Sequence, residues 1–80
     1  MVRKMELNGT NLLVFAFIYN YYSTVQAKVT KKDVMKFFNL SDRGARHKIY
    51  FLVRKGFIVR QEIVQENGYK CVYYPNKDLI

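Results

Sequence analysis

Apolar residues occur in four stretches along the chain, and the spacing within each stretch predicts its own element. Residues 12–22 are apolar almost throughout, with only Asn20 interrupting them. Their length and lack of strict alternation favour a helix over about 10–23, capped by Thr10 or Asn11. A buried strand is the alternative, because Val, Phe, Ile and Tyr also favour sheets.

The apolar helix predicted at the start of the chain also predicts a second subunit. A helix that is apolar all round is buried on both faces. A chain of 80 residues is too short to surround it, because small domains bury only about 60% of the surface that their unfolded chains expose. We expect one side of the helix to be the interface of a homodimer, formed by Val14, Phe17, Ile18 and Tyr21.

A second, shorter helix is predicted over about 31–38. Thr30 is a favourable N-cap, and Asp33 takes the third helical position, where its side chain can complete a capping box. Residues 27–29 before it can form a short strand. One face of this helix carries Val34, Phe37 and Phe38.

A third helix is predicted over about 42–55, only a few residues after the second one ends. Ser41 is its N-cap, and Gly56 supplies the left-handed residue that commonly ends a helix. Its core-facing positions are Ala45, Ile49, Leu52 and Val53. Two helices joined by so short a turn indicate a helix-turn-helix.

Two β-prone runs on either side of Asn67-Gly68 predict a hairpin over about 57–74. Asn-Gly is the preferred pair for a type I′ turn, which needs positive φ at both central residues. With these two residues central, Ile63 faces Val72 across the hairpin. The pattern leaves open which face of the hairpin packs on the core.

The chain carries a formal net charge of +8, and the position of this charge is informative. Residues 28–60 hold ten of the 14 Lys and Arg residues but two of the six acidic residues, so the whole excess lies there. Concentrated positive charge is typical of proteins that bind polyanions. It favours nucleic acid as the partner over an anionic membrane.

Composition excludes several classes of protein. Half of the residues are hydrophobic and 16% are aromatic, which excludes a disordered chain, and 80 residues allow only one domain. Cys71 is the only cysteine, so an internal disulfide and a cysteine-based zinc site are excluded. We expect it as a reduced strand residue, with an inter-subunit disulfide as the alternative. One His, scattered carboxylates and isolated glycines predict no catalytic site, metal or cofactor.

The sequence also predicts an intracellular protein. Its start is basic at Arg3 and Lys4, but the apolar residues that follow lack a cleavage site for a signal peptide. The longest apolar stretch, residues 12–22, is shorter than the about 20 residues that a membrane-spanning helix needs. We therefore expect a cytoplasmic protein without a membrane partner.

Residues 29–34, 40–49 and 52–60, in which a serine-capped helix ends in Leu-Val-Arg-Lys-Gly before the hairpin, resemble the winged-helix DNA-binding family. The resemblance is to MarR-like and ArsR-like regulators and covers about residues 10–75. The chain lacks the long flanking dimerisation helices of full-length MarR proteins, and it is similar to compact regulators encoded by archaea, their viruses and plasmids. The resemblance implies an α+β fold: one winged helix-turn-helix domain over 1–80, with three helices plus a C-terminal two-stranded β-hairpin wing.

The resemblance implies that the third predicted helix enters the major groove of duplex DNA. Its base-reading candidates are Arg43, Gly44, Arg46, His47 and Tyr50. Arginine suits this role independently, because its guanidinium can bond O6 and N7 of guanine, whereas Tyr50 can alternatively pack against the wing. The candidates for contacts to the DNA backbone are Lys31, Lys32, Ser41, Arg54, Arg60 and Lys70.

We therefore expect a sequence-specific duplex-DNA-binding protein, a transcriptional regulator that acts as a homodimer with its recognition helices in successive major grooves. If the source is a virus, it acts in the host cytoplasm. One alternative is a winged-helix module that binds protein within a transcription or replication complex, with which the apolar first helix is compatible. Another is a binder of RNA or single-stranded nucleic acid, favoured by the seven tyrosines. No enzymatic activity and no small-molecule ligand is expected.

Overall fold

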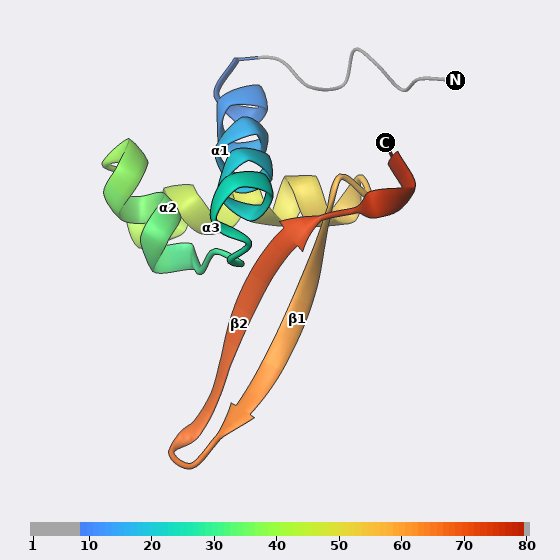
Figure 1. Cartoon of the computed structure of the whole chain (residues 1–80). Coiled ribbons are helices and arrows are strands. Elements are labelled where there is room, and N and C mark those ends of the chain that lie inside the picture. The colour runs from blue at the N-terminus through green and yellow to red at the C-terminus, as the bar shows by residue number, and fades with distance from the viewer. Residues whose placement is uncertain (1–8, 80) are drawn as a thin grey trace.

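Three helices precede a two-stranded antiparallel hairpin in the computed structural model, which describes residues 9–79 (Figure 1). The elements are α1 (Gly9–Val25), α2 (Lys31–Phe38), α3 (Asp42–Arg54), β1 (Ile58–Gln65), β2 (Gly68–Pro75) and a short 3₁₀ turn, η1 (Lys77–Leu79). This layout matches a winged helix with a C-terminal wing, which confirms the predicted α+β fold class. The basic start of the predicted domain, Arg3 and Lys4, lies outside the described residues.

A small cluster of buried side chains joins the three helices to the base of the wing. It contains Val14, Ile18, Val29, Val34, Ala45, Ile49, Leu52, Phe57 and Ile58. Each of the larger aliphatic side chains stabilises the fold by roughly 1.5–3 kcal/mol through burial. The predicted core positions of α3 are confirmed at Ala45, Ile49 and Leu52, whereas Val53 lies half-buried at the edge of the cluster.

The helix α1 extends beyond both of its predicted ends. It begins at Gly9, so Thr10 and Asn11 lie inside its first turn and do not cap it. At the other end, Gln26 adopts a left-handed φ of 62°, and its N–H donates to the Tyr22 carbonyl oxygen at 3.1 Å. The sequence does not mark this end, because residues other than glycine and asparagine seldom adopt a positive φ.

The predicted dimer interface on α1 is wrong for its two aliphatic residues. Val14 and Ile18 have no exposed surface and form part of the core of their own chain. Phe17 is half-buried and stacks on Phe37 of α2, with 4.4 Å between the ring centroids. Of the four predicted residues, only Tyr21 is exposed, with 37% of its surface open to solvent. Helical spacing groups these residues correctly, but it does not tell which side of the helix meets the rest of the chain.

Both helices of the helix-turn-helix are capped as predicted. At α2, Asp33 N donates to Thr30 Oγ1 at 3.2 Å and Thr30 N donates to Asp33 Oδ2 at 2.9 Å, which completes a capping box. At α3, Gly44 N donates to Ser41 Oγ at 3.0 Å. The predicted left-handed residue after α3 is confirmed as Gly56, with a φ of 84°. These local signals therefore fix the two helix starts and the end of α3.

The short strand expected before α2 is reduced to a single β-bridge. Val29 N donates to the Tyr73 carbonyl oxygen at 3.1 Å, and Tyr73 N donates to the Val29 carbonyl oxygen at 2.8 Å. Beside it, Lys28 Nζ donates to Gln61 Oε1 at 2.8 Å and lies 4.7 Å from the ring centroid of Tyr74. The segment between α1 and α2 is thereby fixed to the base of the wing.

The turn of the wing lies one residue earlier than predicted. Gln65 pairs with Gly68, so Glu66 and Asn67 are the two turn residues, and neither has a positive φ. Gly68 supplies the positive φ, at 128°. A type I′ turn, which needs positive φ at both central residues, is therefore excluded.

The register of the wing is consequently shifted by two residues from the prediction. Ile63 lies opposite Lys70 instead of Val72. Because side chains alternate between the two faces of a strand, a shift of two keeps the same residues together on each face of the hairpin. At the base of the wing both faces are covered: Ile58 and Tyr73 pack with the core cluster, whereas Val72 on the opposite face is also buried and Tyr74 there stacks on Tyr22 of α1.

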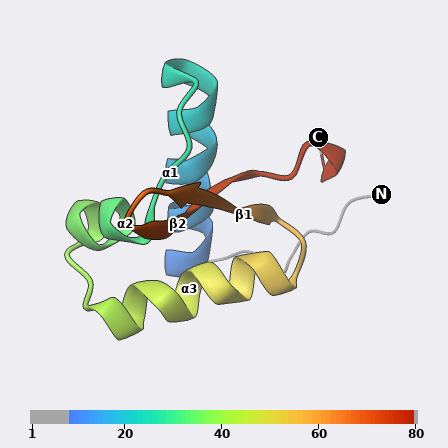
Figure 2. The same ribbon diagram turned by 90° about the horizontal axis from the view of Figure 1, so that it is seen from below.

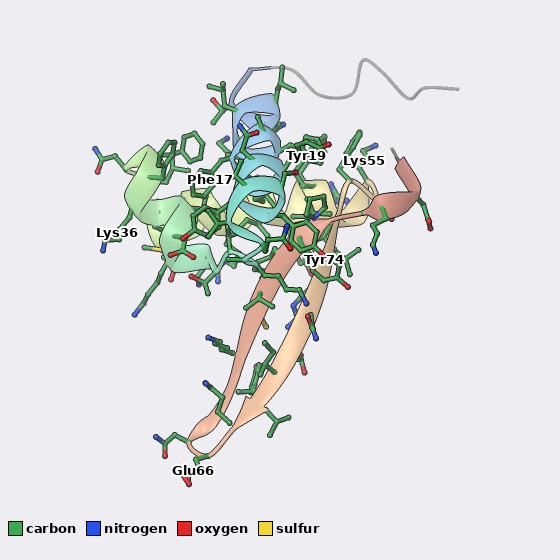
Figure 3. The ribbon with its side chains drawn as sticks, viewed as in Figure 1. Phe17, Tyr19, Lys36, Lys55, Glu66 and Tyr74 are labelled. Carbon is green, nitrogen blue, oxygen red and sulfur yellow. The ribbon has the colours of Figure 1, made fainter. Side chains whose placement is uncertain are left out.

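The two halves of the wing differ in their support. At the base, Tyr74 stacks on Tyr22 of α1, with 5.8 Å between the ring centroids. The outer half projects away from the helices to a tip marked by Glu66 (Figure 3). Here Val64 and Tyr69 pair across the strands and are 85% and 63% exposed. The helices therefore hold the base of the wing, whereas pairing between the two strands holds the outer half.

Candidate nucleic-acid interface

The outer side of α3 carries four exposed side chains that line one shallow hollow, the α3 concavity. They are Arg43, Arg46, His47 and Tyr50. Their spacing of i, i+3, i+4 and i+7 places them on one face of the helix, and the hollow has a volume of about 500 Å³. Figure 2 shows α3 along one side of the molecule, with α1 extending away from it. Four of the five predicted base-reading residues are thus brought together on an open face.

A second hollow, the wing groove, lies between α3, the start of α2 and the base of the wing, and has a volume of about 460 Å³. Its aliphatic and aromatic lining includes Ile49, Val53 and Tyr73. Its basic lining consists of Lys31, Lys32, Arg46, Arg60 and Lys70. Arg46 and Tyr50 line both hollows, and Tyr50 is 65% exposed between them. The two hollows therefore form one continuous basic surface.

Arg60 is oriented along the wing by neighbours on the wing itself. Its Nη2 lies 3.1 Å from Glu62 Oε2, and both side chains of this ion pair are about half exposed. The negative charge of the Cys71 thiolate form and a hydrogen bond with Tyr73 raise the pKa of Arg60. Cys71 is a half-buried free thiol, and the inter-subunit disulfide stays a prediction. Arg60 is therefore a permanently charged group that borders the wing groove.

Lys31, an expected contact to the DNA backbone, is paired within the chain. Its Nζ donates to both carboxylate oxygens of Asp42 at 3.0 Å, which links the start of α2 to the start of α3. The side chains of the pair are 34% and 58% exposed. The hydrogen bond from Lys31, together with the charges of Lys31 and Arg46, holds the pKa of the Asp42 carboxyl below its usual range. The ammonium group is therefore neutralised where it was expected to meet phosphate.

Gly44 and Ser41 serve the start of α3 and lie outside the residues that line the α3 concavity. A Cβ at Gly44 would meet Ser41 Oγ at 3.3 Å and the Leu40 side chain at 3.9 Å. The missing side chain leaves room for the cap, whose hydroxyl oxygen accepts from Gly44 N. A side chain at Gly44 would therefore point toward the turn between α2 and α3, and the expected close approach of Gly44 to DNA stays a prediction.

Of the remaining basic side chains, some are exposed to solvent and others pack over aromatic rings of their own chain. Lys32 and Lys70, two of the predicted contacts to the DNA backbone, are exposed and line the wing groove. Arg54 is exposed in the last turn of α3 but lines neither hollow. Lys28 and Lys55 lie over aromatic rings of their own chain, with Nζ 4.7 and 5.9 Å from the ring centroids (Lys55 is labelled in Figure 3). Some of the basic residues within 28–60 thus make contacts within the fold.

An exposed aromatic face lies between α1 and α2, and it contains two of the predicted interface residues, Phe17 and Tyr21, beside two that were not predicted, Leu13 and Phe37. We define this aromatic face by Leu13, Phe17, Tyr21 and Phe37. Phe37 is 66% exposed and Leu13 is 57% exposed, and the groove beside them has a volume of about 350 Å³. Figure 3 shows Phe17 on the side of α1 that faces α2. Phe37 and Phe38 lie about 100° apart on their helix. This spacing indicates in the sequence that the two rings are not both buried in the core.

No family model matches this sequence, and no curated protein sequence matches it. Within residues 9–79, His, Cys, Asp and Glu side chains form no group of three that could hold a metal ion. Within the same range, every helix is too short or too polar to cross a membrane.

Proposed function

We propose that this protein binds duplex DNA sequence-specifically and regulates transcription in the cytoplasm as a homodimer. The observation that carries the proposal is the α3 concavity, where two arginines, a histidine and a tyrosine lie together on one exposed helix face. An α-helix fits the major groove of B-DNA, where each base pair presents a distinct pattern of donors and acceptors. The resemblance of the sequence to MarR-like and ArsR-like regulators supports the same assignment.

Arg43 and Arg46 are the groups that read bases in this proposal. Each guanidinium can donate two hydrogen bonds to O6 and N7 of one guanine. The two residues are three positions apart, which is about 4.5 Å along the helix axis, and base pairs follow one another every ~3.4 Å. They can therefore address neighbouring base pairs. His47 and Tyr50 extend the same face, and the ring of Tyr50 is suited to the methyl group of thymine.

The part of the wing that borders the wing groove, and not the tip of the wing, contacts the DNA backbone in this proposal. Lys32 and Lys70 border the wing groove, and such cations position a protein on phosphates without reading sequence. Arg60 borders it too, and its guanidinium keeps further N–H donors for phosphate beside the nitrogen that pairs with Glu62. The tip of the wing carries Glu66 (Figure 3), and Glu62 already pairs with Arg60. The Glu66 carboxylate repels phosphate, so the tip of the wing is a poor support for the DNA backbone.

A second copy of the chain covers the aromatic face in this proposal. Phe37 stacks on Phe17 and remains 66% exposed, beside a groove that Leu13 also lines. Contiguous exposed apolar surface is typical of interaction sites. A two-fold dimer uses the same patch on both chains, and the aromatic face offers both a protruding ring and a groove. The face is therefore complementary to itself.

Charge at the edge of the aromatic face favours a second copy as the occupant. Asp33 and Lys36 line a hollow together with Phe17, Tyr21 and Phe37. Because two-fold symmetry brings the edge of one patch against that of the other, Lys36 of each copy can meet the partner's Asp33. The cations of the α3 concavity lie on a different helix, so the two copies do not bring their strongest positive charges together at this interface.

A salt titration of duplex binding tests the DNA assignment. We expect affinity for a mixed-sequence duplex to fall steeply with salt, because each phosphate contact contributes a slope of about −0.9 to log K against log salt. Selection from a random duplex pool should return an inverted repeat whose half-sites lie about 34 Å apart. Absence of duplex binding, or affinity that ignores salt, contradicts the proposal. Tighter binding to single strands or RNA supports the alternative nucleic-acid function.

The dimer is tested by sedimentation equilibrium. We expect the wild-type protein to have twice the chain mass of 9.6 kDa at micromolar concentration, and Phe37→Asp to have the mass of one chain. Tyr69→Asp is the matched control, because Tyr69 is also an exposed aromatic, at 63%, but lies on the wing. A wild-type monomer, or a Phe37→Asp dimer, contradicts the interface. A monomer that also fails to bind duplex DNA supports a protein-binding module instead.

A further inference from the structure

Asp42 is an isolated negative charge in the most basic part of the chain. It is the only acidic residue between Asp33 and Glu62. It occupies the first position of α3, directly before Arg43, and its side chain is 58% exposed. An acidic residue at this position stabilises the positive end of the helix, but it also stands where the proposed DNA surface begins.

The partner of Asp42 is a group that would otherwise bind phosphate. Lys31 Nζ donates to both carboxylate oxygens at 3.0 Å, so one ammonium group is held by two hydrogen bonds. Lys31 also lines the wing groove with Lys32, which makes no such pair among the described residues. Two neighbouring lysines at the same helix start are therefore in different electrostatic states.

We propose that Asp42 attenuates the binding of DNA phosphate by holding Lys31 in an ion pair within the chain. Asp42 is a positioning residue, since it acts through Lys31. The pair contributes no net charge to the basic surface. The part of the DNA affinity that comes from phosphate contacts is therefore lower than a count of the lysines and arginines on this surface would predict. Sequence reading is left to Arg43 and Arg46. This inference rests on the proposed DNA-binding function.

The salt dependence of binding to a short mixed-sequence duplex tests the inference, with Asp42→Asn as the variant. Removing the carboxylate releases Lys31 to phosphate, so the slope of log K against log salt should steepen by about 0.9. One additional contact of this kind tightens binding roughly eightfold at ~0.1 M salt. Asp78→Asn is the matched control, because it changes the net charge equally but removes an exposed acid of the C-terminal turn that lines neither hollow.

A double-mutant cycle shows whether Asp42 acts through Lys31. Lys31→Ala alone should weaken binding without changing the salt slope, because it leaves the Asp42 carboxylate unpaired and repelling phosphate. The double variant, Lys31→Ala with Asp42→Asn, should return both affinity and slope to nearly wild-type values. A purely structural role of the pair would leave the slope constant, and thermal unfolding of each variant reports such a role separately.

The outcomes separate this inference from the function on which it rests. If the wild-type protein binds duplex DNA and Asp42→Asn binds no more tightly than Asp78→Asn, the attenuation is overturned and DNA binding stands. A slope that steepens equally in the double variant also overturns it, because Lys31 is then not the released cation. If neither the wild-type protein nor Asp42→Asn binds duplex DNA at low salt, the proposed function fails and the inference fails with it.

Discussion

The α3 concavity and the aromatic face are both exposed, but water solvates them differently. The first is lined by charged and polar groups, which are well hydrated without a partner. The second exposes Phe37 and Leu13, and apolar surface left in water costs about 25 cal/mol for each Å². The first face is therefore stable when it is empty, whereas the second gains free energy whenever another apolar surface covers it.

One small core lies between the two faces. Leu52 of α3 and Ile18 of α1 are both fully buried in it. The residues of each face lie outside this core or at its edge, so the faces can be changed separately. A change in the core alters both faces together, because the core holds α1 and α3 against each other.

The largest effect is expected from Leu52→Ala. It removes buried methyl groups and leaves a cavity, so we expect a loss of about 3 kcal/mol in the free energy of unfolding. Phe37→Ala, at a position 66% exposed, should cost less than about 1 kcal/mol within one chain. Urea unfolding measures both. At higher protein concentration the cost of Phe37→Ala should grow, because dimerisation contributes to stability. Equal losses at all concentrations would place Phe37 in the core.

The next effect concerns the α3 concavity. Arg46→Ala should weaken binding at the selected DNA site by about 1–3 kcal/mol and relax one base position, because the guanidinium reads a guanine. The sedimentation mass should not change, since Arg46 lines neither hollow at the aromatic face. Lys48→Ala is the control, as Lys48 carries the same charge but lines neither hollow. If Arg46→Ala weakened binding equally at every DNA sequence, Arg46 would contact phosphate and would not read a base.

A smaller effect is expected at the start of α3. Ser41→Ala removes the oxygen that accepts from Gly44 N at 3.0 Å, so the free energy of unfolding should fall by about 1 kcal/mol. Ser23→Ala, at an exposed position near the end of α1, should change it by less than ~0.5 kcal/mol. Thermal unfolding compares the two. An Ser41→Ala protein as stable as Ser23→Ala contradicts the importance of the cap.

The smallest effect is the pH dependence that Asp42 contributes to stability. Its pKa in the folded protein lies below the ordinary value of 3.8, because Lys31 donates to the carboxylate. The ionised carboxylate therefore favours the folded state above pH 3.8, and this contribution is lost as the pH falls through the lower folded value. The melting temperature of Asp42→Asn should fall less than that of the wild-type protein over this acidic range. Parallel curves would show that the exposed pair adds nothing to stability.

Much of the fold follows from local chemistry that the sequence displays. Thr30 with Asp33, and Ser41, fix the starts of two helices, because a side-chain oxygen beside a free backbone N–H needs no distant partner. Gly56 ends α3 for the same local reason. The spacing of Arg43 and Arg46 also predicted that they share one helix face. These groups were predictable because each depends on neighbours within one or two turns of chain.

The tertiary structure alone decided how these elements are used. Val14 and Ile18 pack inward because α2, α3 and the wing base meet that side of α1, and periodicity fixes only the angle between residues. Lys31 and Asp42 meet because the turn between α2 and α3 brings two helix starts together. The wing turns at Glu66 and Asn67, because the turn must fit both the positive φ of Gly68 and the pairing of the two strands. Contacts between distant segments depend on how elements dock, and no local pattern in a sequence encodes that.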